Sequence, residues 1–323
     1  MKKKERMKIY TLLLGALFVS PTQAQTMHDW ENHHVLQINR EPARAAFTPF
    51  SVQKGDGSIS LDGTWKFRWT PVPNERVVNF YQTNFNDKDW TDFPVPANWE
   101  VNGYGTPIYV SAGYPFKIDP PRVMGEPKTD YTTYKERNPV GQYRRTFVLP
   151  AGWEANGQTF LRFEGVMSAF YVWINGKRVG YSQGSMEPSE FNVTKYLKSG
   201  ENQISLEVYR YSDGSYLEDQ DFWRFGGIHR SIHLIHTPDI HVRDYAVRTL
   251  PASAGDYEDF ILQIDPQFSV YRGMTGKGDV LQGGLKDASG KEVATLKGNV
   301  EDILDLEHKA SRMNEWYPQR GPR

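Results

Sequence analysis

The chain contains no cysteine among its 323 residues. This absence excludes disulfide bonds, thiolate metal sites, a cysteine nucleophile and lipid attachment to a cysteine. The sequence also lacks an excess of charge of either sign, because 38 Lys and Arg are balanced by 39 Asp and Glu, for a formal net charge of -1. Balanced charge excludes the basic surface with which a protein binds nucleic acid or an anionic membrane as its partner.

Long hydrophobic runs are also missing, apart from residues 9–19 near the N-terminus. This run follows a cluster of lysines and is shorter than the roughly 20 apolar residues that a membrane-spanning helix needs. Thr22 and Ala24 then supply the small side chains that a signal peptidase requires. We therefore expect residues 1–24 to be a signal peptide and the mature protein to be periplasmic or secreted, without a membrane span. A membrane anchor is the alternative.

Aromatic residues, in contrast, are abundant at 14% of the chain, together with 28 Gly and 20 Pro. This mixture favours short strands and turns over helices. Apolar and polar residues alternate with a period of two, and Asn175-Gly176 predicts a hairpin with a type I′ turn. Residues 58–238 are predicted to form an all-β sandwich of jelly-roll type. Strands are expected at residues 65–69, 143–148, 159–163, 169–174, 177–181, 203–209 and 231–236.

A second unit is predicted in residues 239–306. An immunoglobulin-like sandwich fits the spacing of its strands but needs about seven strands and ~100 residues, so this unit is expected to be incomplete. Residues 25–57 form an N-terminal segment, and residues 307–323 form an irregular tail. The chain is therefore interpreted either as a fragment of a longer protein or as a chain whose tail has lost its proper continuation. In the second unit, strands are expected at residues 241–249, 260–265, 279–286 and 292–296, with a turn at 287–291.

Residues 93–138 are the first region that is typical of a binding site. This segment is too long and too rich in Pro, Tyr and Gly to be a simple connection, and long loops are usually functional. Aromatic rings beside amides and carboxylates suit a sugar, because its apolar face stacks on a ring while its hydroxyls need fixed donors and acceptors. The alternative is that these aromatic residues only pack the loop.

The second such region has four carboxylates within nine positions, at Asp213, Glu218, Asp219 and Asp221. They would repel one another unless cations or sugar hydroxyls offset their charge, so a site is favoured over a solvated acidic loop. The Asp-x-Asp-x-Asp-Gly spacing of an EF-hand is absent. Carboxylate oxygens nevertheless suit a hard cation.

Seven segments carry a resemblance to a known family. They are residues 29–32 (DWEN), 61–67 (LDGTWKF), 95–99 (VPANW), 141–145 (GQYRR), 172–176 (VWING), 180–183 (GYSQ) and 212–230. Together they resemble the N-terminal part of the large bacterial β-galactosidases of glycoside hydrolase family 2. The resemblance implies a jelly-roll sugar-binding domain, an immunoglobulin-like domain and then a (β/α)₈ barrel with two catalytic glutamates.

The resemblance places both catalytic glutamates in the barrel, so no catalytic residue is expected in this chain. It implies that Asn98 and Asp221 bind the hydroxyls of a galactoside and that Asp221 also ligates Na⁺. The alternative roles are a loop cap for Asn98 and an ion pair between Asp221 and Arg224. Glu218 is expected to support the site rather than to perform chemistry.

The resemblance also implies a Mg²⁺ site that joins the N-terminal segment to the first domain. Its ligands would be Asp29, Asn32, the main-chain carbonyl of Val35, Gln183 and Asp213, all of which offer the oxygen atoms that Mg²⁺ prefers. Full-length members of the family are homo-oligomers. We therefore expect this chain to be the N-terminal part of an exported β-galactosidase, an enzyme that hydrolyses terminal β-D-galactose. The alternative is a free-standing carbohydrate-binding module without catalysis.

Overall fold

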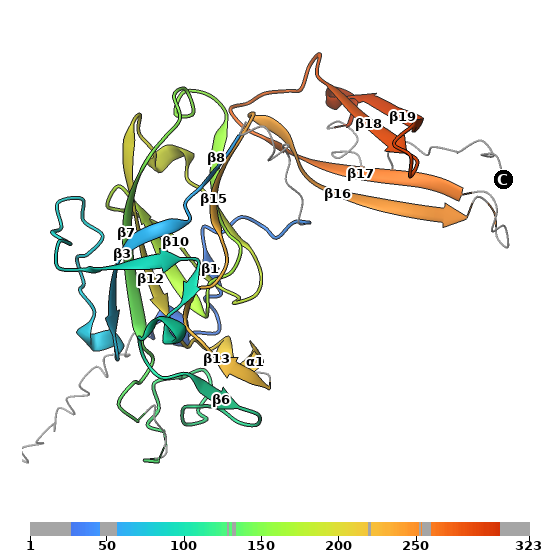
Figure 1. Cartoon of the computed structure of the whole chain (residues 1–323). Coiled ribbons are helices and arrows are strands. Elements are labelled where there is room, and N and C mark those ends of the chain that lie inside the picture. The colour runs from blue at the N-terminus through green and yellow to red at the C-terminus, as the bar shows by residue number, and fades with distance from the viewer. Residues whose placement is uncertain are drawn as a thin grey trace, which may run out of the picture.

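The computed structural model describes residues 27–45, 57–127, 129–130, 134–218, 221–251, 253 and 260–303. Within these ranges the chain is nearly all β, and hairpins extend to one side of a sandwich (Figure 1). The predicted signal peptide and the predicted tail lie outside the described residues. No helix in the described part is long and apolar enough to cross a membrane.

The sandwich consists of two antiparallel sheets. The larger sheet has seven strands in the order β1-β10-β9-β12-β7-β3-β4, and the smaller has four in the order β11-β8-β15-β2. The strands of the larger sheet are β1 (Gln37–Ile38), β3 (Gly63–Thr70), β4 (Thr91–Val95), β7 (Val140–Val148), β9 (Ala169–Ile174), β10 (Lys177–Gln183) and β12 (Glu201–Tyr209). Those of the smaller sheet are β2 (Ser58–Ser60), β8 (Gln158–Phe163), β11 (Ser189–Asn192) and β15 (Ile232–Thr237).

The core lies between the two sheets and is filled by alternate side chains of each strand. In β3, Trp65 and Phe67 are buried whereas Arg68 is exposed, as the period-two pattern predicts. Phe163 of β8 and Phe170 of β9 come from opposite sheets, and their ring centroids lie 4.6 Å apart. Full burial of one such ring contributes roughly 1.5–3 kcal/mol. The buried aromatic residues of the sequence fill this core and a second cluster, which includes Trp30, Trp173 and Tyr209.

All strands predicted for the first unit are confirmed, in β3, β7, β8, β9, β10, β12 and β15. The predicted hairpin turn is confirmed as well, because Asn175 and Gly176 have φ angles of 51° and 78°, and a type I′ turn requires positive φ at both central residues. Asn175 Oδ1 also accepts a hydrogen bond from the Gln203 N–H at 3.0 Å. This bond fixes the turn to β12.

Residues 93–138, predicted as one long loop, contain short strands instead. β5 (Ala97–Asn98) pairs with β14 (Gly227–Ile228), and β6 (Ile108–Val110) pairs with β13 (Phe222–Arg224). Strands this short show no readable alternation, which is why the sequence pattern did not reveal them. The short helical elements of the described residues include η1 (Asp29–Glu31), η3 (Pro73–Glu75), η4 (Glu100–Asn102), η6 (Thr194–Tyr196) and α1 (Ser215–Glu218).

The described part of the second unit contains two hairpins. β16 (Ile240–Pro251) pairs with β17 (Phe260–Val270), and β18 (Val280–Lys286) pairs with β19 (Glu292–Asn299). The four strands predicted there are confirmed. In the predicted turn, Asp287 Oδ1 accepts hydrogen bonds from the main-chain N–H groups of Ser289 at 2.9 Å and Lys291 at 3.0 Å. Each hairpin forms a two-stranded sheet of its own.

Glu190 joins three parts of the chain through one buried carboxylate. It accepts hydrogen bonds from Arg44 of the N-terminal segment at 2.9 Å, from Arg162 of β8 at 3.3 Å and from Arg243 of β16. Burial alone would raise the pKa of Glu190, but attraction to Arg44 and Arg243 outweighs burial, and the pKa is lowered. The carboxylate therefore stays ionised and holds β16 against the sandwich.

Candidate sugar and cation sites

Asp221 lies exposed at the start of the small sheet formed by β6 and β13. It accepts a hydrogen bond from the Tyr109 hydroxyl at 2.5 Å. This hydrogen bond raises the pKa of Tyr109, because loss of the phenolic proton would place two negative charges side by side. Tyr109 therefore remains protonated and orients one oxygen of the Asp221 carboxylate. The other oxygen makes no hydrogen bond to a described residue.

Two aromatic rings beside Asp221 form a platform that the sequence analysis did not identify. Tyr109 and Trp223 are directly opposite each other in the β6–β13 pairing, with ring centroids 5.7 Å apart. Trp223 also stacks on Phe225 at 6.0 Å with ring planes 5° apart. Tyr109 and Trp223 remain 52% and 49% exposed. The available signal was the run Phe-Trp-Arg-Phe that follows Asp221.

Asn98 lies on β5, opposite Gly227 of β14. Its main-chain carbonyl accepts a hydrogen bond from Asn102 Nδ2 at 2.8 Å, so Asn102 provides a side-chain cap for this loop. The half-buried side-chain amide of Asn98 makes no hydrogen bond to any residue that the structure describes. No hydrogen bond joins Asn98 to Asp221, although Asn98 is paired with β14 and Asp221 directly precedes β13.

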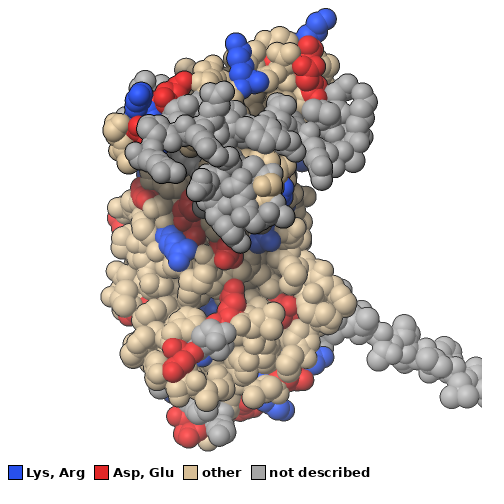
Figure 2. Space-filling view, turned by 90° about the vertical axis from the view of Figure 1, so that its right-hand side faces the viewer, with Lys and Arg blue, Asp and Glu red and all other residues tan. Residues whose placement is uncertain are grey.

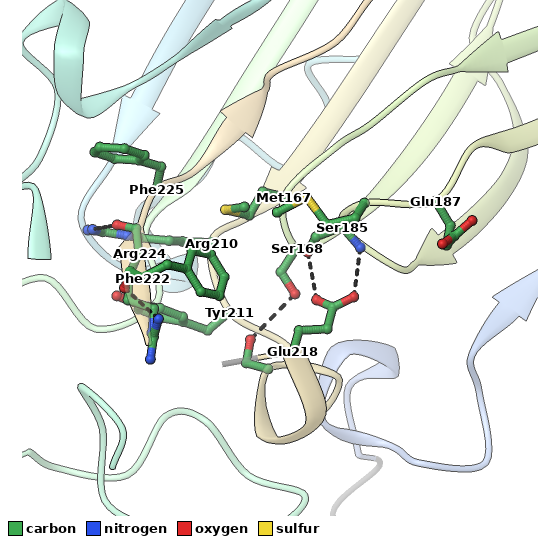
Figure 3. A pocket seen from close by; sticks show the side chains of 12 residues that line it. Met167, Ser168, Ser185, Glu187, Arg210, Tyr211, Glu218, Phe222, Arg224 and Phe225 are labelled. Carbon is green, nitrogen blue, oxygen red and sulfur yellow. Dashed lines mark hydrogen bonds between the residues drawn. The ribbon is translucent and has the colours of Figure 1, made fainter. Parts of the chain in front are cut away.

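A pocket of about 370 Å³ lies beside this surface (Figure 3). Phe222 and Arg224, which alternate with Trp223 along β13, line it. Glu218 lies at its edge and points toward Ser185, whose N–H and hydroxyl donate hydrogen bonds to it at 2.7 Å and 2.6 Å. Neither Asn98 nor Asp221 lines this pocket, so the predicted sugar-binding residues lie outside it.

The described carboxylates of the acidic run point to different partners. Asp213 is bonded to Gln183, Glu218 to Ser185 and Asp221 to Tyr109. Their mutual repulsion is thus relieved by separate hydrogen bonds rather than by a single cluster. Asp219 lies outside the described residues. Acidic and basic side chains are also interspersed on the face of the molecule shown in Figure 2.

A buried ion pair fixes the segments that carry the candidate sugar-binding residues. Arg210 Nε lies 3.2 Å from Glu100 Oε1, and the two side chains are 0% and 1% exposed. Arg210 Nη2 also donates to the carbonyls of Thr106 at 2.9 Å and Arg224 at 2.6 Å. Glu100 accepts a hydrogen bond from the Gly226 N–H at 3.0 Å. The pair therefore ties η4 and the segment before β6 to β13.

Asp213 and Gln183 form the centre of the predicted Mg²⁺ site. Gln183 Nε2 donates hydrogen bonds to Asp213 Oδ1 at 2.6 Å and to the main-chain carbonyl of Asp29 at 3.5 Å. Asp213 is only 8% exposed, and burial raises the pKa of its carboxyl. No described Lys or Arg forms an ion pair with it. A buried carboxylate that forms no ion pair with a described Lys or Arg fits a cation ligand.

The carboxylate of Asp29 has protein partners of its own. Asp29 Oδ2 accepts hydrogen bonds from the Tyr171 hydroxyl at 2.7 Å and from Arg178 Nη2 at 3.1 Å. The structure therefore connects Asp29 to Gln183 through the main chain and directs its carboxylate toward β9 and β10. As a result, the segment before β1 is held against the larger sheet.

Asn32 and Val35 lie on the turn that follows η1. Asn32 Oδ1 accepts a hydrogen bond from the His34 N–H at 3.2 Å, and the Asn32 carbonyl accepts one from the Val35 N–H at 2.8 Å. No hydrogen bond links Asn32 or Val35 to Gln183 or Asp213. The described residues contain no metal-suited group of three or more His, Cys, Asp or Glu. The predicted set has two carboxylates and would depend on amide and carbonyl oxygens for the rest.

The family of the sandwich follows from comparison with known sequences. Residues 59–238 match the family described as "Glycosyl hydrolases family 2, sugar binding domain". The chain belongs to glycosyl hydrolase family 2. The matched residues run from β2 to β15 and include the small β6–β13 sheet. The aromatic platform and Asp221 are therefore part of the family 2 sugar-binding domain.

Relatives of the family 2 domain include enzymes named beta-galactosidase. The one from Priestia megaterium is 38% identical over 305 residues, which are 90% of this chain and 28% of the relative. The one from Yersinia pestis bv. Antiqua is 41% identical over 238 residues, which are 72% of this chain and 21% of the relative. The chain thus spans about a quarter of the length of these relatives.

Solved structures of similar fold match the chain at lower sequence identity. A beta-glucuronidase from an uncultured Clostridium sp. matches with a TM-score of 0.59 and 19% identity, covering 87% of this chain and 42% of that one. A Bifidobacterium dentium beta-glucuronidase matches with a TM-score of 0.57 and 20% identity, covering 82% of this chain and 42% of that one. At this identity the likeness shows the fold alone.

In this family 2 domain, the surface around Asp221 combines the groups that a sugar requires. Tyr109 and Trp223 offer exposed ring faces for the apolar side of a pyranose. Asp221 offers a carboxylate oxygen that can accept a hydrogen bond from a hydroxyl, and charge-assisted hydrogen bonds of this kind are stronger than neutral ones. The surface can therefore hold and orient a sugar.

Proposed function

We propose that this chain is the sugar-binding N-terminal part of a β-galactosidase, an enzyme that hydrolyses terminal β-D-galactose. The observation that carries the proposal is the 41% identity over 238 residues to a relative named beta-galactosidase. The solved β-glucuronidases share the fold but are only about half as similar, at 19% and 20% identity. Galactosides are therefore the substrate class that the sequence relationships favour.

In this proposal Asn98 and Asp221 contact the hydroxyls of the galactose, and Tyr109 holds the Asp221 carboxylate in place. Trp223 supplies a ring face against which the sugar or the group bonded to it packs. Asp221 would also hold Na⁺. The positive charge of the ion would offset the negative charge of the carboxylate and attract the oxygen of a sugar hydroxyl. The exposed Asp221 oxygen that makes no hydrogen bond to a described residue supports both roles.

A free-standing carbohydrate-binding module is the second candidate function. The exposed platform of Tyr109 and Trp223 favours it, because both rings belong to one small sheet within this chain and Asp221 directly precedes that sheet. A module of this kind would bind a galactoside tightly by itself. The two candidates thus differ in the affinity of the isolated chain.

We expect the chain to bind free galactose with a Kd in the millimolar range or weaker, which is a binding free energy of about −4 kcal/mol or less favourable, because it matches only 28% and 21% of the length of the two beta-galactosidase relatives. It should not hydrolyse a chromogenic β-galactoside. Isothermal titration calorimetry and a rate assay on repurified protein measure the two quantities. Micromolar binding that Asp221→Ala abolishes would instead establish the free-standing module.

We also propose that Asp29, Asn32, the Val35 carbonyl, Gln183 and Asp213 hold Mg²⁺. The buried carboxylate of Asp213 and the oxygen-rich composition of the set support this proposal. The bound ion would supply the positive charge that Asp213 otherwise lacks. It would also link the segment around η1 to β10 and α1.

Mg²⁺ is therefore expected to raise the melting temperature of the chain, with a stabilisation of about 2.7 kcal/mol at a hundredfold excess over Kd. Because burial raises the pKa of Asp213, the ion-free protein loses stability as the pH rises through that pKa. The Mg²⁺ effect should grow over the same range, since only the ionised carboxylate binds the ion. Thermal scans with Mg²⁺ and with chelator at several pH values test this.

Asp213→Asn should abolish the Mg²⁺ effect, whereas Asp92→Asn, which alters an exposed ion pair with Lys66, should retain it. Equal melting temperatures with Mg²⁺ and with chelator, in the wild-type chain at every pH, would contradict the site.

We further propose that the protein is exported after cleavage of residues 1–24 and that the full-length enzyme is a homo-oligomer. The N-terminal sequence pattern supports the first point. N-terminal sequencing of the product from the periplasm or medium, and the mass of the full-length enzyme in solution, test the two points separately.

A further inference from the structure

A second groove lies away from the Asp221 surface, between the N-terminal segment, η6 and the turn after β17. Its volume is about 700 Å³. The groove lies between three segments that are distant in the sequence, represented by Arg40, Lys195 and Arg272. None of its lining residues belongs to β6, β13 or the acidic run.

The charges in this groove are predominantly positive and partly unpaired. Its lining includes Arg40, Lys195 and Arg272 but a single carboxylate, Glu41. Arg272 Nε lies 3.5 Å from Asp239 Oδ1. Neither Arg40 nor Lys195 forms an ion pair with a carboxylate among the described residues. Three cationic side chains against one carboxylate in the same groove favour an anionic ligand.

Arg40 is held in a fixed position by neutral groups. Its Nε donates to Gln37 Oε1 at 2.6 Å, and its Nη1 donates to Ser182 Oγ and to the Gln183 carbonyl, both at 3.1 Å. Burial lowers the pKa of Arg40, which is the direction expected for a guanidinium that is partly withdrawn from water. A carboxylate or sulfate that accepts a hydrogen bond from Arg40 Nη2, which donates to no described residue, would offset this cost, because hydrogen bonds between charged groups are stronger than neutral ones.

The walls of the groove carry amides and tyrosines in addition to the cations. Asn192 Nδ2 donates to Gln158 Oε1 at 3.1 Å, and Thr194 Oγ1 donates to Asn192 Oδ1 at 2.7 Å. This network fixes the polar groups before any ligand binds. Tyr196 and Tyr271 are half-buried beside them. Fixed amides and hydroxyls next to aromatic rings suit the alternating polar and apolar surfaces of a sugar.

We propose that this groove binds an acidic saccharide chain, with its carboxylate or sulfate groups at Arg40 and Lys195 and its sugar rings along Tyr196 and Tyr271. The site would be an accessory one, which recruits charged glycan to the protein independently of the surface around Asp221. It goes beyond the proposed function and does not depend on it.

Calorimetric titration of the full chain with tetragalacturonate, a sulfated galacto-oligosaccharide and neutral galactotetraose tests the proposal. At least one acidic chain should bind about tenfold tighter than the neutral one, and added salt should weaken it. Preference between the two acidic chains would identify the charged group that is recognised. Equal binding of neutral and acidic chains, or inorganic sulfate competing as well as the saccharides, would overturn the proposal.

Variants locate the binding. Lys195→Gln should weaken binding of the acidic saccharide about fivefold or more. The exposed Lys195 side chain makes no hydrogen bond to a described residue and lies 5.2 Å from the centroid of the Tyr196 ring, so the loss of stability should be at most about 1 kcal/mol. Arg40→Lys, which keeps the charge but loses the Nη2 donors, should also weaken binding. Lys88→Gln, an exposed lysine outside the groove, and Asp221→Ala should have no effect. An equal loss of affinity with Lys88→Gln would show non-specific attraction and overturn the proposal. A loss of affinity with Asp221→Ala would instead place the acidic saccharide at the surface around Asp221.

Discussion

Replacing Arg210 with alanine is expected to lower the free energy of unfolding by about 3–5 kcal/mol, the usual cost of leaving one partner of a buried ion pair alone. The Glu100 carboxylate would remain buried without its cation, and the Thr106 and Arg224 carbonyls would lose a donor. Urea unfolding followed by tryptophan fluorescence measures the change. Because total stabilities are typically about 5–15 kcal/mol, this loss would be a large fraction of the whole.

The pH dependence of the same variant gives a second readout. Burial raises the pKa of Glu100, and attraction to Arg210 partly offsets that rise. Without Arg210 the pKa should rise further. A buried acid with a raised pKa costs stability when it is ionised, so the deficit of Arg210→Ala should shrink as the pH falls through that pKa.

An exposed ion pair provides the control. Arg122 lies 3.3 Å from Asp119, and the two side chains are 59% and 52% exposed. Arg122→Ala should therefore cost at most about 1 kcal/mol. Equal losses from Arg210→Ala and Arg122→Ala would contradict the role given to the buried pair.

The sequence predicted the sandwich because its strands are long enough for alternation to be visible. β3 and β12 each have one face against the core, and the apolar residues of that face recur at every second position. The Asn175-Gly176 turn was predictable for a local reason, since few residues other than these tolerate positive φ. The motifs of family 2 then added the order of the domains.

The contacts that organise the candidate site were not predictable in this way. Tyr109 and Asp221 are 112 residues apart, and Glu100 and Arg210 lie on elements that only the folded chain brings together. The strands that carry Tyr109 and Trp223 have three residues each, so pairing rather than local pattern defines them. A single sequence contains no signal for such long-range partners. The chemical composition of the site could be predicted, but its geometry could not.

The largest functional effect is expected from Asp221→Ala in a full-length β-galactosidase that carries this domain, a prediction that depends on the proposed function. The substitution removes a charged hydrogen-bond acceptor for the sugar and a ligand for Na⁺. Loss of about 2.7 kcal/mol of transition-state binding, within the usual cost of breaking a hydrogen bond to a charged group, lowers kcat/KM by about 100-fold. The melting temperature should change little, because Asp221 is exposed and its described hydrogen bond is to Tyr109.

Two further measurements on the full-length enzyme separate a role in binding from a structural one. Dependence of kcat/KM on the Na⁺ concentration should disappear in Asp221→Ala but persist in Tyr109→Phe, which only frees the carboxylate from its hydrogen bond. Tyr109→Phe should also lower kcat/KM by a smaller factor, since the carboxylate remains but is no longer oriented. If Asp221→Ala left kcat/KM unchanged, or lowered it only in proportion to a fall in melting temperature, Asp221 would belong to the scaffold of β13 and not to the sugar site.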